Sequence, residues 1–164
     1  MTVHIRRAGA LDAGAMADLL NAIIARGGTT AMTDPVTREM MIDKMARRAE
    51  AAAWHIAEDE NGALLGFQWI APRDDLPETA CDIATFVRVG QTGLGVGSAL
   101  FEATKAAARA LGYDWINATI RTDNEGGLIY YQSRGFEDYK TLDPAPLADG
   151  FVVGRRCKRF DLHR

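Results

Sequence analysis

The sequence predicts one mixed α/β domain, in which helices flank a central sheet. Three observations lead to this prediction. The hydrophobic pattern changes several times between the spacing of a helix and that of a strand. No internal repeat or long linker divides the chain, and its 164 residues suit a single domain with a sizeable core. The domain is therefore expected to span residues 1–164, with elements in the order β-α-α-β-β-β-α-β-α-β-β.

Each element follows from a local pattern. Apolar residues that alternate or run together indicate strands, and apolar residues at i, i+3 and i+4 indicate helices. Glycines end the helices, and Asn61-Gly62 is typical of a hairpin turn. The expected elements are a strand at 3–7, helices at 12–26 and 37–52, strands at 54–59, 63–71 and 79–89, a helix at 95–111, a strand at 115–120, a helix at 124–134, strands at 136–141 and 152–162, and a proline-containing loop at 143–150.

Composition excludes several classes of protein. A formal net charge of -3 argues against a protein that binds duplex nucleic acid, because such proteins need a basic face. No apolar run is long enough for a membrane span, and the N-terminus has no secretory stretch, so we expect a cytoplasmic protein without a membrane partner. Cys81 and Cys157 are expected to be small buried hydrophobes. No cluster has metal-ligand spacing, so no metal is expected.

The strongest functional signal is the segment Gly93-Leu94-Gly95-Val96-Gly97-Ser98, which lies between a strand and an amphipathic helix. The first turn of a helix has unpaired N–H groups and a partial positive charge, so it favours an anion. Glycines let the backbone approach that anion closely. The segment therefore predicts a phosphate or pyrophosphate site.

Other glycine loops fit less well. A P-loop requires Gly-Lys before Ser or Thr, whereas Gly97 is followed directly by Ser98. A dinucleotide loop reads G-x-G-x-x-G and opens a βαβ unit, whereas this loop reads G-x-G-x-G and lies past the middle of the chain. A turn that merely permits tight packing of helix on sheet stays a minority alternative.

The segment 93–100 resembles the acetyl-CoA loop of the GNAT superfamily of N-acetyltransferases, R/Q-x-x-G-x-G/A. The segment 124–136 is similar to the second motif of that family, N-x-x-A-x-x-x-Y-x-x-x-G-F. The resemblance covers about residues 80–139. Thr92 stands where the family often has Arg or Gln, which leaves the pyrophosphate to backbone amides. Gly127 replaces the usual Ala, which should weaken the short helix by roughly 1 kcal/mol.

The resemblance implies a GNAT-like domain with a mostly antiparallel sheet, acetyl-CoA as co-substrate, and direct attack of an amine on the thioester. It implies that Tyr131 protonates the departing thiolate; a buried aromatic with one hydrogen bond is the alternative. Asn124 would contact the pantetheine arm, although Asn also caps helices well. The implied cofactor-binding residues are Phe86 and Val87 through their backbone, Gly93, Leu94, Gly95, Val96, Gly97, Ser98 and Asn124.

The general base is the least defined part of the predicted site. Some members of the family carry a glutamate five residues before the asparagine, but that position is Thr119 here, which cannot accept the proton of an amine. Asp82 and Glu78 are the available carboxylates, acting through water, and each has a structural or solvated alternative.

The acceptor is expected to be a small amino-acid-like amine or another amine. Its pocket is expected to form from residues 27–31, the second helix and the loop between the closing strands. The resemblance also suggests a homodimer. The alternative hypothesis is a non-catalytic coenzyme A-binding or partner-binding module on the same scaffold. A nucleotide-binding oxidoreductase is a third, less favoured possibility.

Overall fold

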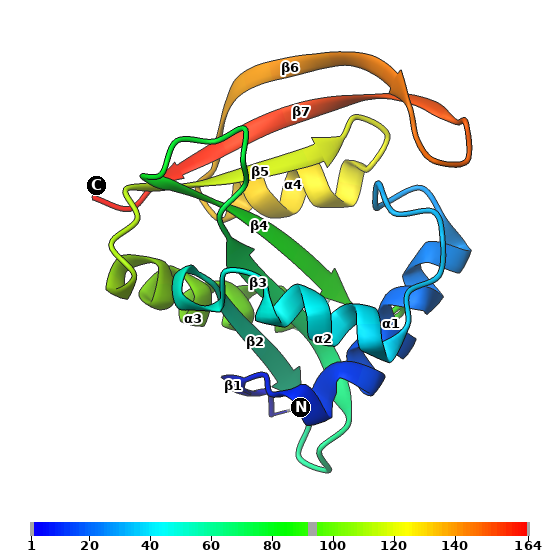
Figure 1. Ribbon diagram of the computed structural model, residues 1–164, viewed down its shortest axis with the longest axis vertical. Coiled ribbons are helices and arrows are strands. Elements are labelled where there is room, and N and C mark those ends of the chain that lie inside the picture. The colour runs from blue at the N-terminus through cyan, green and yellow to red at the C-terminus, as the bar shows by residue number, and fades with distance from the viewer. Residues whose placement is uncertain (1, 92–94, 164) are drawn as a thin grey trace.

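A computed structural model describes residues 2–91 and 95–163 of the chain. Seven strands form one sheet in the order β1-β2-β3-β4-β5-β7-β6, and every neighbouring pair is antiparallel except β4 and β5 (Figure 1). The predicted element order and the mixed, mostly antiparallel sheet are confirmed. The elements are β1 (His4–Arg7), η1 (Ala10–Asp12), α1 (Ala13–Arg26), α2 (Arg38–Ala46), η2 (Ala49–Ala51), β2 (Ala53–Glu58), β3 (Leu64–Ala71), β4 (Ala80–Val87), α3 (Val96–Ala110), β5 (Trp115–Arg121), α4 (Glu125–Ser133), β6 (Glu137–Pro146) and β7 (Val152–Asp161).

The helices cover the two faces of the sheet, because successive strand residues point to opposite sides. We call these the α1 face and the α3 face. On the α1 face, α1 and α2 pack on an aromatic layer in which the rings of Trp54 and Trp69 stack 4.2 Å apart. On the α3 face, α3 and α4 pack on apolar residues of β2 to β5, with Phe101 and Phe136 in the core. Apolar burial on both faces is the main stabilising force.

The two parallel strands separate part-way along their length. β4 and β5 pair only at Ala80↔Trp115, Cys81↔Ile116 and Asp82↔Asn117. Beyond that point β4 stays paired with β3 as far as Val87, while β5 stays paired with β7 as far as Arg121. β4 therefore has an edge without a strand partner in the middle of the sheet, among the residues that the structure describes.

Two predicted boundaries differ from the structure by more than two residues. The second helix ends at Ala46 rather than near residue 52, because Arg47 is extended (ψ 117°) and Arg48 is left-handed (φ 50°). The final loop was expected to begin at residue 143, but β6 continues to Pro146. Prolines fit there because β6 is the edge strand and its register with β7 shifts between Leu142 and Ala145.

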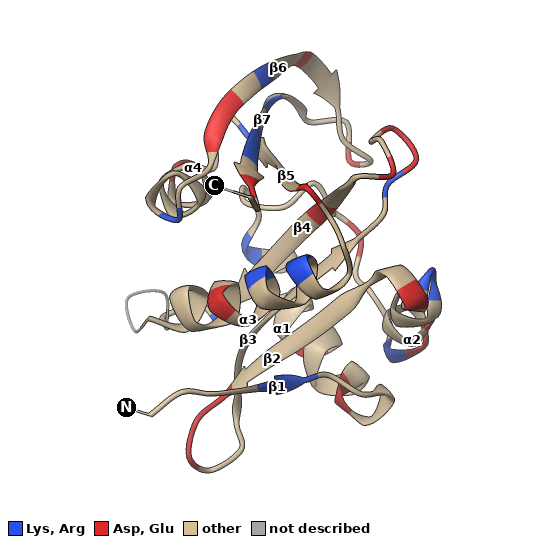
Figure 2. Cartoon of the chain, turned by 90° about the vertical axis from the view of Figure 1, so that its left-hand side faces the viewer, with Lys and Arg blue, Asp and Glu red and all other residues tan. Residues whose placement is uncertain are grey.

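The charges are distributed unevenly along the sheet. Figure 2 shows Lys, Arg, Asp and Glu along β6 and β7, whereas β3 carries none. Within the described part of the chain, none of the helices has the length and apolar character that a membrane crossing requires. Cys81 and Cys157 are buried and free, as predicted.

Candidate active site

The first turn of α3 is the predicted anion site, and the structure describes it from Gly95 onward. Gly95 is the N-cap in the left-handed region (φ 77°), where glycine has little strain, and Val96 begins the 15-residue helix. The hydroxyl of Ser98 accepts a hydrogen bond from Arg134 Nη1 (2.6 Å), which ties this turn to the end of α4. Gly93 and Leu94 lie outside the described residues.

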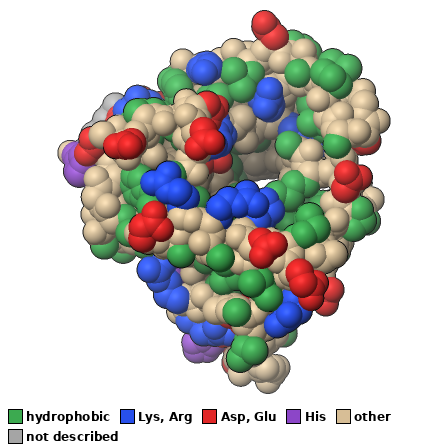
Figure 3. All heavy atoms as spheres, viewed as in Figure 1, with side chains coloured by type: hydrophobic (Ala, Val, Ile, Leu, Met, Phe, Trp, Pro, Cys, Tyr) green, Lys and Arg blue, Asp and Glu red, His purple; other side chains and the backbone are tan. Residues whose placement is uncertain are grey.

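The unpaired edge of β4 leads from this turn to the point where β4 and β5 separate. Val87 presents its backbone on that edge, and its side chain packs on the α3 face. The backbone of Phe86 faces β3, because Arg88, two residues on, donates its N–H to the Leu65 carbonyl, and the side chain of Phe86 is buried in the α1 face. Figure 3 shows the surface hollowed beside β4, where β5 separates from it. An extended amide-containing chain could pair with this edge as an added strand.

Tyr131 lies on the α3 face of this separation. Its hydroxyl is 2.8 Å from Thr85 Oγ1 on β4. The ring is buried and packs against Tyr130 and Phe136. Burial raises the pKa of Tyr131 well above its ordinary value, and the hydrogen bond with Thr85 partly opposes this rise. The predicted general acid and the buried hydrogen-bonded aromatic are therefore the same side chain.

Asn124 caps α4, so the capping alternative is confirmed for this residue. Its Oδ1 accepts from the backbone N–H of Gly127 (3.0 Å), and its Nδ2 donates to the Thr29 carbonyl (3.0 Å). A Cβ on Gly127 would lie 2.5 Å from Asn124 Nδ2, so an alanine there would displace the cap. The cap therefore requires glycine at position 127, although glycine has a lower helix propensity than alanine.

Asp82 lies at the separation on the α1 face, opposite to the face of Tyr131. Its Oδ1 accepts from Asn117 Nδ2 (2.8 Å) and is 3.3 Å from Arg73 Nη1. Burial raises the pKa of Asp82, and the charge of Arg73 opposes this rise. Glu78 is exposed, four residues before Asp82, in the turn in which the Ala80 N–H donates to the Pro77 carbonyl (3.0 Å).

Sequence reasoning missed the residues that surround Asp82. Thr119 Oγ1 accepts from Asn117 Nδ2 (3.0 Å) and from Arg73 Nη1 (3.3 Å), and the hydroxyl of Tyr139 donates to Asn117 Oδ1. A signal was present in β5, where polar residues occupy alternate positions 117, 119 and 121 of an otherwise mostly apolar strand. This alternation marks a polar α1 face.

Arg121 holds the loop after α1 against this polar face. Its side chain is 7% exposed, forms two hydrogen bonds with Asp123 (2.9 and 2.8 Å), and donates to the Thr30 carbonyl (2.9 Å). The ring of Phe151, from the turn between β6 and β7, lies 5.5 Å from its guanidinium. The loop at 27–31 and the closing hairpin therefore meet at β5. The acceptor pocket expected from these two segments and the second helix stays a prediction.

Among the described residues, no group of three or more His, Cys, Asp or Glu side chains could hold a metal ion. The polar groups at the separation lie on two faces of one gap and form hydrogen bonds with one another. This arrangement could accept an extended ligand between β4 and β5, with Asp82 and Tyr131 on its two sides.

Comparison with known proteins agrees with this geometry. The profile of the acetyltransferase (GNAT) family matches residues 19–136. The YwnH protein of Bacillus subtilis (strain 168), provisionally named a phosphinothricin acetyltransferase, is 29% identical over 154 residues, covering 92% of this chain and 90% of that protein. The phosphinothricin N-acetyltransferase of Streptomyces viridochromogenes is 26% identical over 150 residues, covering 90% of this chain and 81% of that protein.

Solved structures share the fold. An N-acetyltransferase from Staphylococcus aureus Mu50 superposes with a TM-score of 0.88 at 22% identity, covering 99% of both chains. A GNAT superfamily phosphinothricin acetyltransferase from Sinorhizobium meliloti, in complex with AcCoA, superposes with a TM-score of 0.87 at 19% identity, covering 98% of this chain and 89% of that one. With the family profile matched over most of the chain, the protein belongs to the acetyltransferase (GNAT) family and is an enzyme that transfers acetyl groups.

Proposed function

We propose that the chain moves the acetyl group of acetyl-CoA to the primary amine of a small amino-acid-like molecule by direct attack. The observation that carries this proposal is the separation of β4 from β5 after Asp82, next to the first turn of α3. An unpaired strand edge and a helix N-terminus suit the two ends of one ligand, an amide-containing arm and a pyrophosphate.

The cofactor-binding residues follow from these two features. The backbone of Val87 pairs with the pantetheine arm, beside Phe86, whose own backbone faces β3. The N–H groups from Gly95 to Ser98 bind the pyrophosphate. Gly93 and Leu94 belong to this proposal through the sequence motif alone. Asn124 holds the entrance to the gap through its bond to the Thr29 carbonyl. Acetyl-CoA, when bound, supplies a thioester that an amine can attack without a covalent enzyme intermediate.

Asp82 removes a proton from the amine, directly or through water. A lysine-type amine has a reference pKa of about 10.4, so it is mostly protonated at neutral pH and cannot attack until it loses a proton. Burial raises the pKa of Asp82 and so makes it a stronger base than an exposed aspartate. Arg73 favours its ionised form, which is the form that can accept a proton. Glu78 is the second candidate, from its exposed position in the turn before β4.

Tyr131 protonates the departing sulfur on the other face of the gap. Its hydroxyl lies beside Thr85, three residues along β4 from Asp82. The base and the acid thus reach the gap from opposite faces, so that one proton leaves the amine on the α1 face while another reaches the sulfur on the α3 face. This division follows from the alternation of side chains along β4.

The acceptor class is inferred from the polar α1 face and from the relatives. Arg121 and Asn124 fix the loop at 27–31 over this face, which encloses a small molecule better than a flat surface would. Phosphinothricin, the acceptor in the names of the relatives, is a small amino acid. The cytoplasmic location and the homodimer stay predictions.

An assay of thiol release from acetyl-CoA tests the proposal, with phosphinothricin, other amino acids, polyamines and peptides as acceptors. We expect release with small amino acids, and we expect Tyr131→Phe to lower kcat about 100-fold with little change in KM for acetyl-CoA. Tyr113→Phe is the matched control, because that buried tyrosine bonds only the Ala51 carbonyl among the described contacts. Binding of acetyl-CoA without amine-dependent release would favour the non-catalytic module.

A further inference from the structure

A buried hydrogen-bond network connects Tyr131 with the first turn of α3. At its centre is Gln68 on β3, which is fully buried. Gln68 Nε2 donates to Thr85 Oγ1 (2.9 Å) and to the Tyr130 hydroxyl (3.1 Å). Thr85 contacts the Tyr131 hydroxyl (2.8 Å), and the Tyr130 hydroxyl donates to the Gly97 carbonyl (2.7 Å). Tyr130 thus links Gln68 to the first turn of α3.

The Gly97 carbonyl determines the direction of the bonds in this network. A carbonyl can only accept, so the hydroxyl of Tyr130 donates its proton to Gly97. The oxygen of Tyr130 must then accept from Gln68, which places the NH₂ of the Gln68 amide on this side. The second N–H of the same amide donates to Thr85. One end of the network therefore fixes the amide orientation at its centre.

The same logic extends to Tyr131. Because Thr85 Oγ1 already accepts from Gln68, its own hydrogen is available for its other contact, the oxygen of Tyr131. When Thr85 donates that hydrogen, the proton of Tyr131 is directed away from the network and toward the gap between β4 and β5. We propose that Gln68, Thr85 and Tyr130 are positioning residues that keep the Tyr131 proton directed at the sulfur of acetyl-CoA. This inference rests on the proposed role of Tyr131.

The arrangement supports proton transfer in both of its stages. Before transfer, Thr85 occupies a lone pair of the phenol and leaves its O–H free. During transfer the O–H bond of Tyr131 breaks, its proton binds the departing sulfur, and the negative charge falls on the phenolate oxygen. The Thr85 hydrogen bond stabilises that charge, since a bond to an ionised acceptor is stronger than one to a neutral acceptor. Solvent then returns a proton to Tyr131.

A structural role alone does not account for Gln68. Its Oε1 has no hydrogen-bond partner among the described residues, although it is buried. An unsatisfied buried oxygen costs stability, and an apolar side chain of similar shape often costs nothing at such a position. Gln68→Met is therefore expected to keep the melting temperature and lower the rate, which is the opposite of what a stabilising residue would show.

The test compares two substitutions at Thr85 in two backgrounds. Thr85→Val removes the hydroxyl at nearly constant volume, and Thr85→Ser keeps it. Each is made in the wild type and in Tyr131→Phe, and kcat, KM for acetyl-CoA and the melting temperature are measured. Thr104→Val is the matched control, because Thr104 is fully buried on the α3 face and its hydroxyl has no partner among the described residues.

In the wild type we expect Thr85→Val to lower kcat about tenfold, as for one hydrogen bond to a charged group, with KM for acetyl-CoA unchanged. Thr85→Ser and Thr104→Val should stay within about twofold of wild type. In the Tyr131→Phe background, Thr85→Val should have almost no further effect on kcat, because the proton that it positions is gone. Gln68→Met should follow Thr85→Val.

Three results would overturn the inference, and they differ from one another. An equal loss of kcat from Thr85→Val in both backgrounds would mean that Thr85 acts independently of Tyr131. A normal kcat in both Thr85→Val and Gln68→Met, with Tyr131→Phe impaired, would leave the proposed function intact and remove the positioning role. A normal kcat in Tyr131→Phe would show that Tyr131 is not the general acid and would remove the role of the network with it.

Discussion

The two faces of the sheet present opposite chemistry to the gap between β4 and β5. On the α3 face the polar groups are neutral: two phenols, a threonine hydroxyl and a carboxamide, joined in one buried network. On the α1 face they are charged: Asp82 lies beside Arg73, and Arg121 pairs with Asp123. Thr85 and Asp82 both lie on β4. Because successive side chains of a strand point to opposite faces, this one strand separates a neutral environment from an ionic one.

Burial has different consequences for the titratable groups on these two faces. Burial disfavours the charged form of any titratable group, so it raises the pKa of both Tyr131 and Asp82. For the phenol, this keeps Tyr131 protonated at neutral pH, so that its proton is present when the sulfur departs. For the carboxylate, the same shift strengthens a base. The charge of the nearby Arg73 opposes the rise in the pKa of Asp82 and favours its ionised form.

The largest expected effect is the loss of the carboxylate on the α1 face. Asp82→Asn keeps the shape of the side chain and its contact with Asn117, but it removes the base. We expect kcat to fall about 100-fold or more at pH 7. The wild-type rate should itself fall in acid from a higher pH than an ordinary aspartate would give, because burial raises the pKa of Asp82. A pH–rate profile of both proteins measures this.

The same substitution should raise stability. A carboxyl whose pKa is raised in the folded state contributes stability below its unfolded pKa and loses that contribution as the pH rises through the folded pKa. Wild type therefore carries a penalty at pH 7 that Asp82→Asn lacks. We expect the variant to melt higher at pH 7 and the difference to shrink below about pH 4. An unchanged rate in Asp82→Asn would transfer the role to Glu78, with Glu78→Gln as the next variant.

The sequence predicted the parts of the site that depend on local spacing. The first turn of α3 and the seven-residue interval from Asn124 to Tyr131 are each contained in one segment, so the motif and the helix pattern coincide. The separation of β4 from β5 is visible only in the strand pairing, which ends after Asp82↔Asn117. The order of strands and helices was predicted for the same reason, because each element has its own local hydrophobic pattern.

The rest of the site depends on contacts between distant segments. Gln68 meets Tyr130 across 62 residues, and Arg121 meets Thr30 across 91. No periodicity within β3 distinguishes a glutamine that bonds α4 from one that points into solvent. The early end of α2 was missed for a related reason: the left-handed conformation of Arg48 is set by its surroundings, and the sequence has no glycine there to indicate it.

A smaller effect is expected from packing on the α3 face. A Cβ on Gly97 would lie 2.7 Å from Cε1 of Tyr130, so Gly97→Ala must displace that ring and its bond to the Gly97 carbonyl. We expect a loss of about 1–3 kcal/mol in the free energy of unfolding, the usual cost of overpacking. KM for acetyl-CoA should also rise, because the same turn binds the pyrophosphate. Denaturant unfolding and initial rates measure the two effects.

Gly126→Ala is the control for Gly97→Ala. A Cβ on Gly126 would have only Asn124 Oδ1 nearby, at 3.9 Å, so the helix should accept it and gain slightly in stability. If Gly97→Ala matched this control in both unfolding and KM, the neutral network would be more tolerant than the contact implies. The network would then not depend on close packing between Tyr130 and Gly97.

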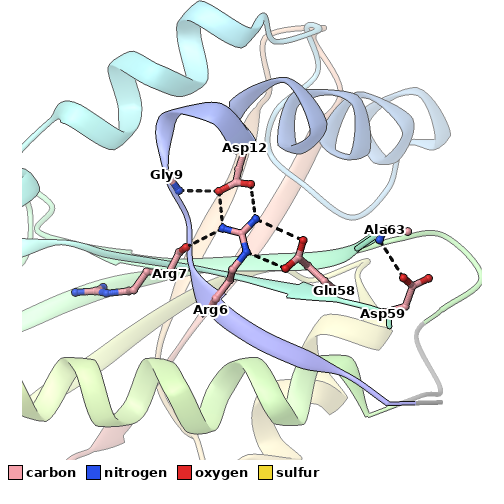
Figure 4. Close-up of polar contacts among 7 residues, drawn as sticks. All are labelled: Arg6, Arg7, Gly9, Asp12, Glu58, Asp59 and Ala63. Atoms are coloured by element: carbon pink, nitrogen blue, oxygen red, sulfur yellow. Dashed lines mark hydrogen bonds and ion pairs between the residues drawn. The ribbon is translucent and has the colours of Figure 1, made fainter. Parts of the chain in front are cut away.

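A third group of charged residues lies away from the gap, at the β1 edge of the sheet. Arg6 on β1 lies between Asp12 and Glu58, with Nη2 2.7 Å from Asp12 Oδ1 and Nε 2.8 Å from Glu58 Oε1 (Figure 4). Asp12 also accepts from the Gly9 N–H (2.7 Å). This cluster joins β1 to the turn before α1 and to the end of β2, at the opposite edge of the sheet from β6.

The smallest expected effect comes from Arg6→Met. The arginine side chain is 48% exposed, so solvent screens its pairs and we expect a loss of less than about 1 kcal/mol. Hydrogen bonds from Arg6 hold the pKa of Asp12 below its usual value, so this stability is present above the unfolded pKa of Asp12 and is lost as the pH falls through the folded one. The difference in melting temperature from wild type should therefore disappear in acid and in about 1 M salt, with kcat unchanged throughout.

Arg38→Met is the control for Arg6→Met. Arg38 forms a looser exposed ion pair with Glu39 (3.8 Å), so this variant should show no difference in melting temperature at any pH. A deficit in Arg6→Met that persisted in acid and salt would come from lost packing of the arginine stem. A fall in kcat would mean that this edge of the sheet is coupled to the gap. The residues that affect catalysis would then not be limited to those on the two faces of the gap.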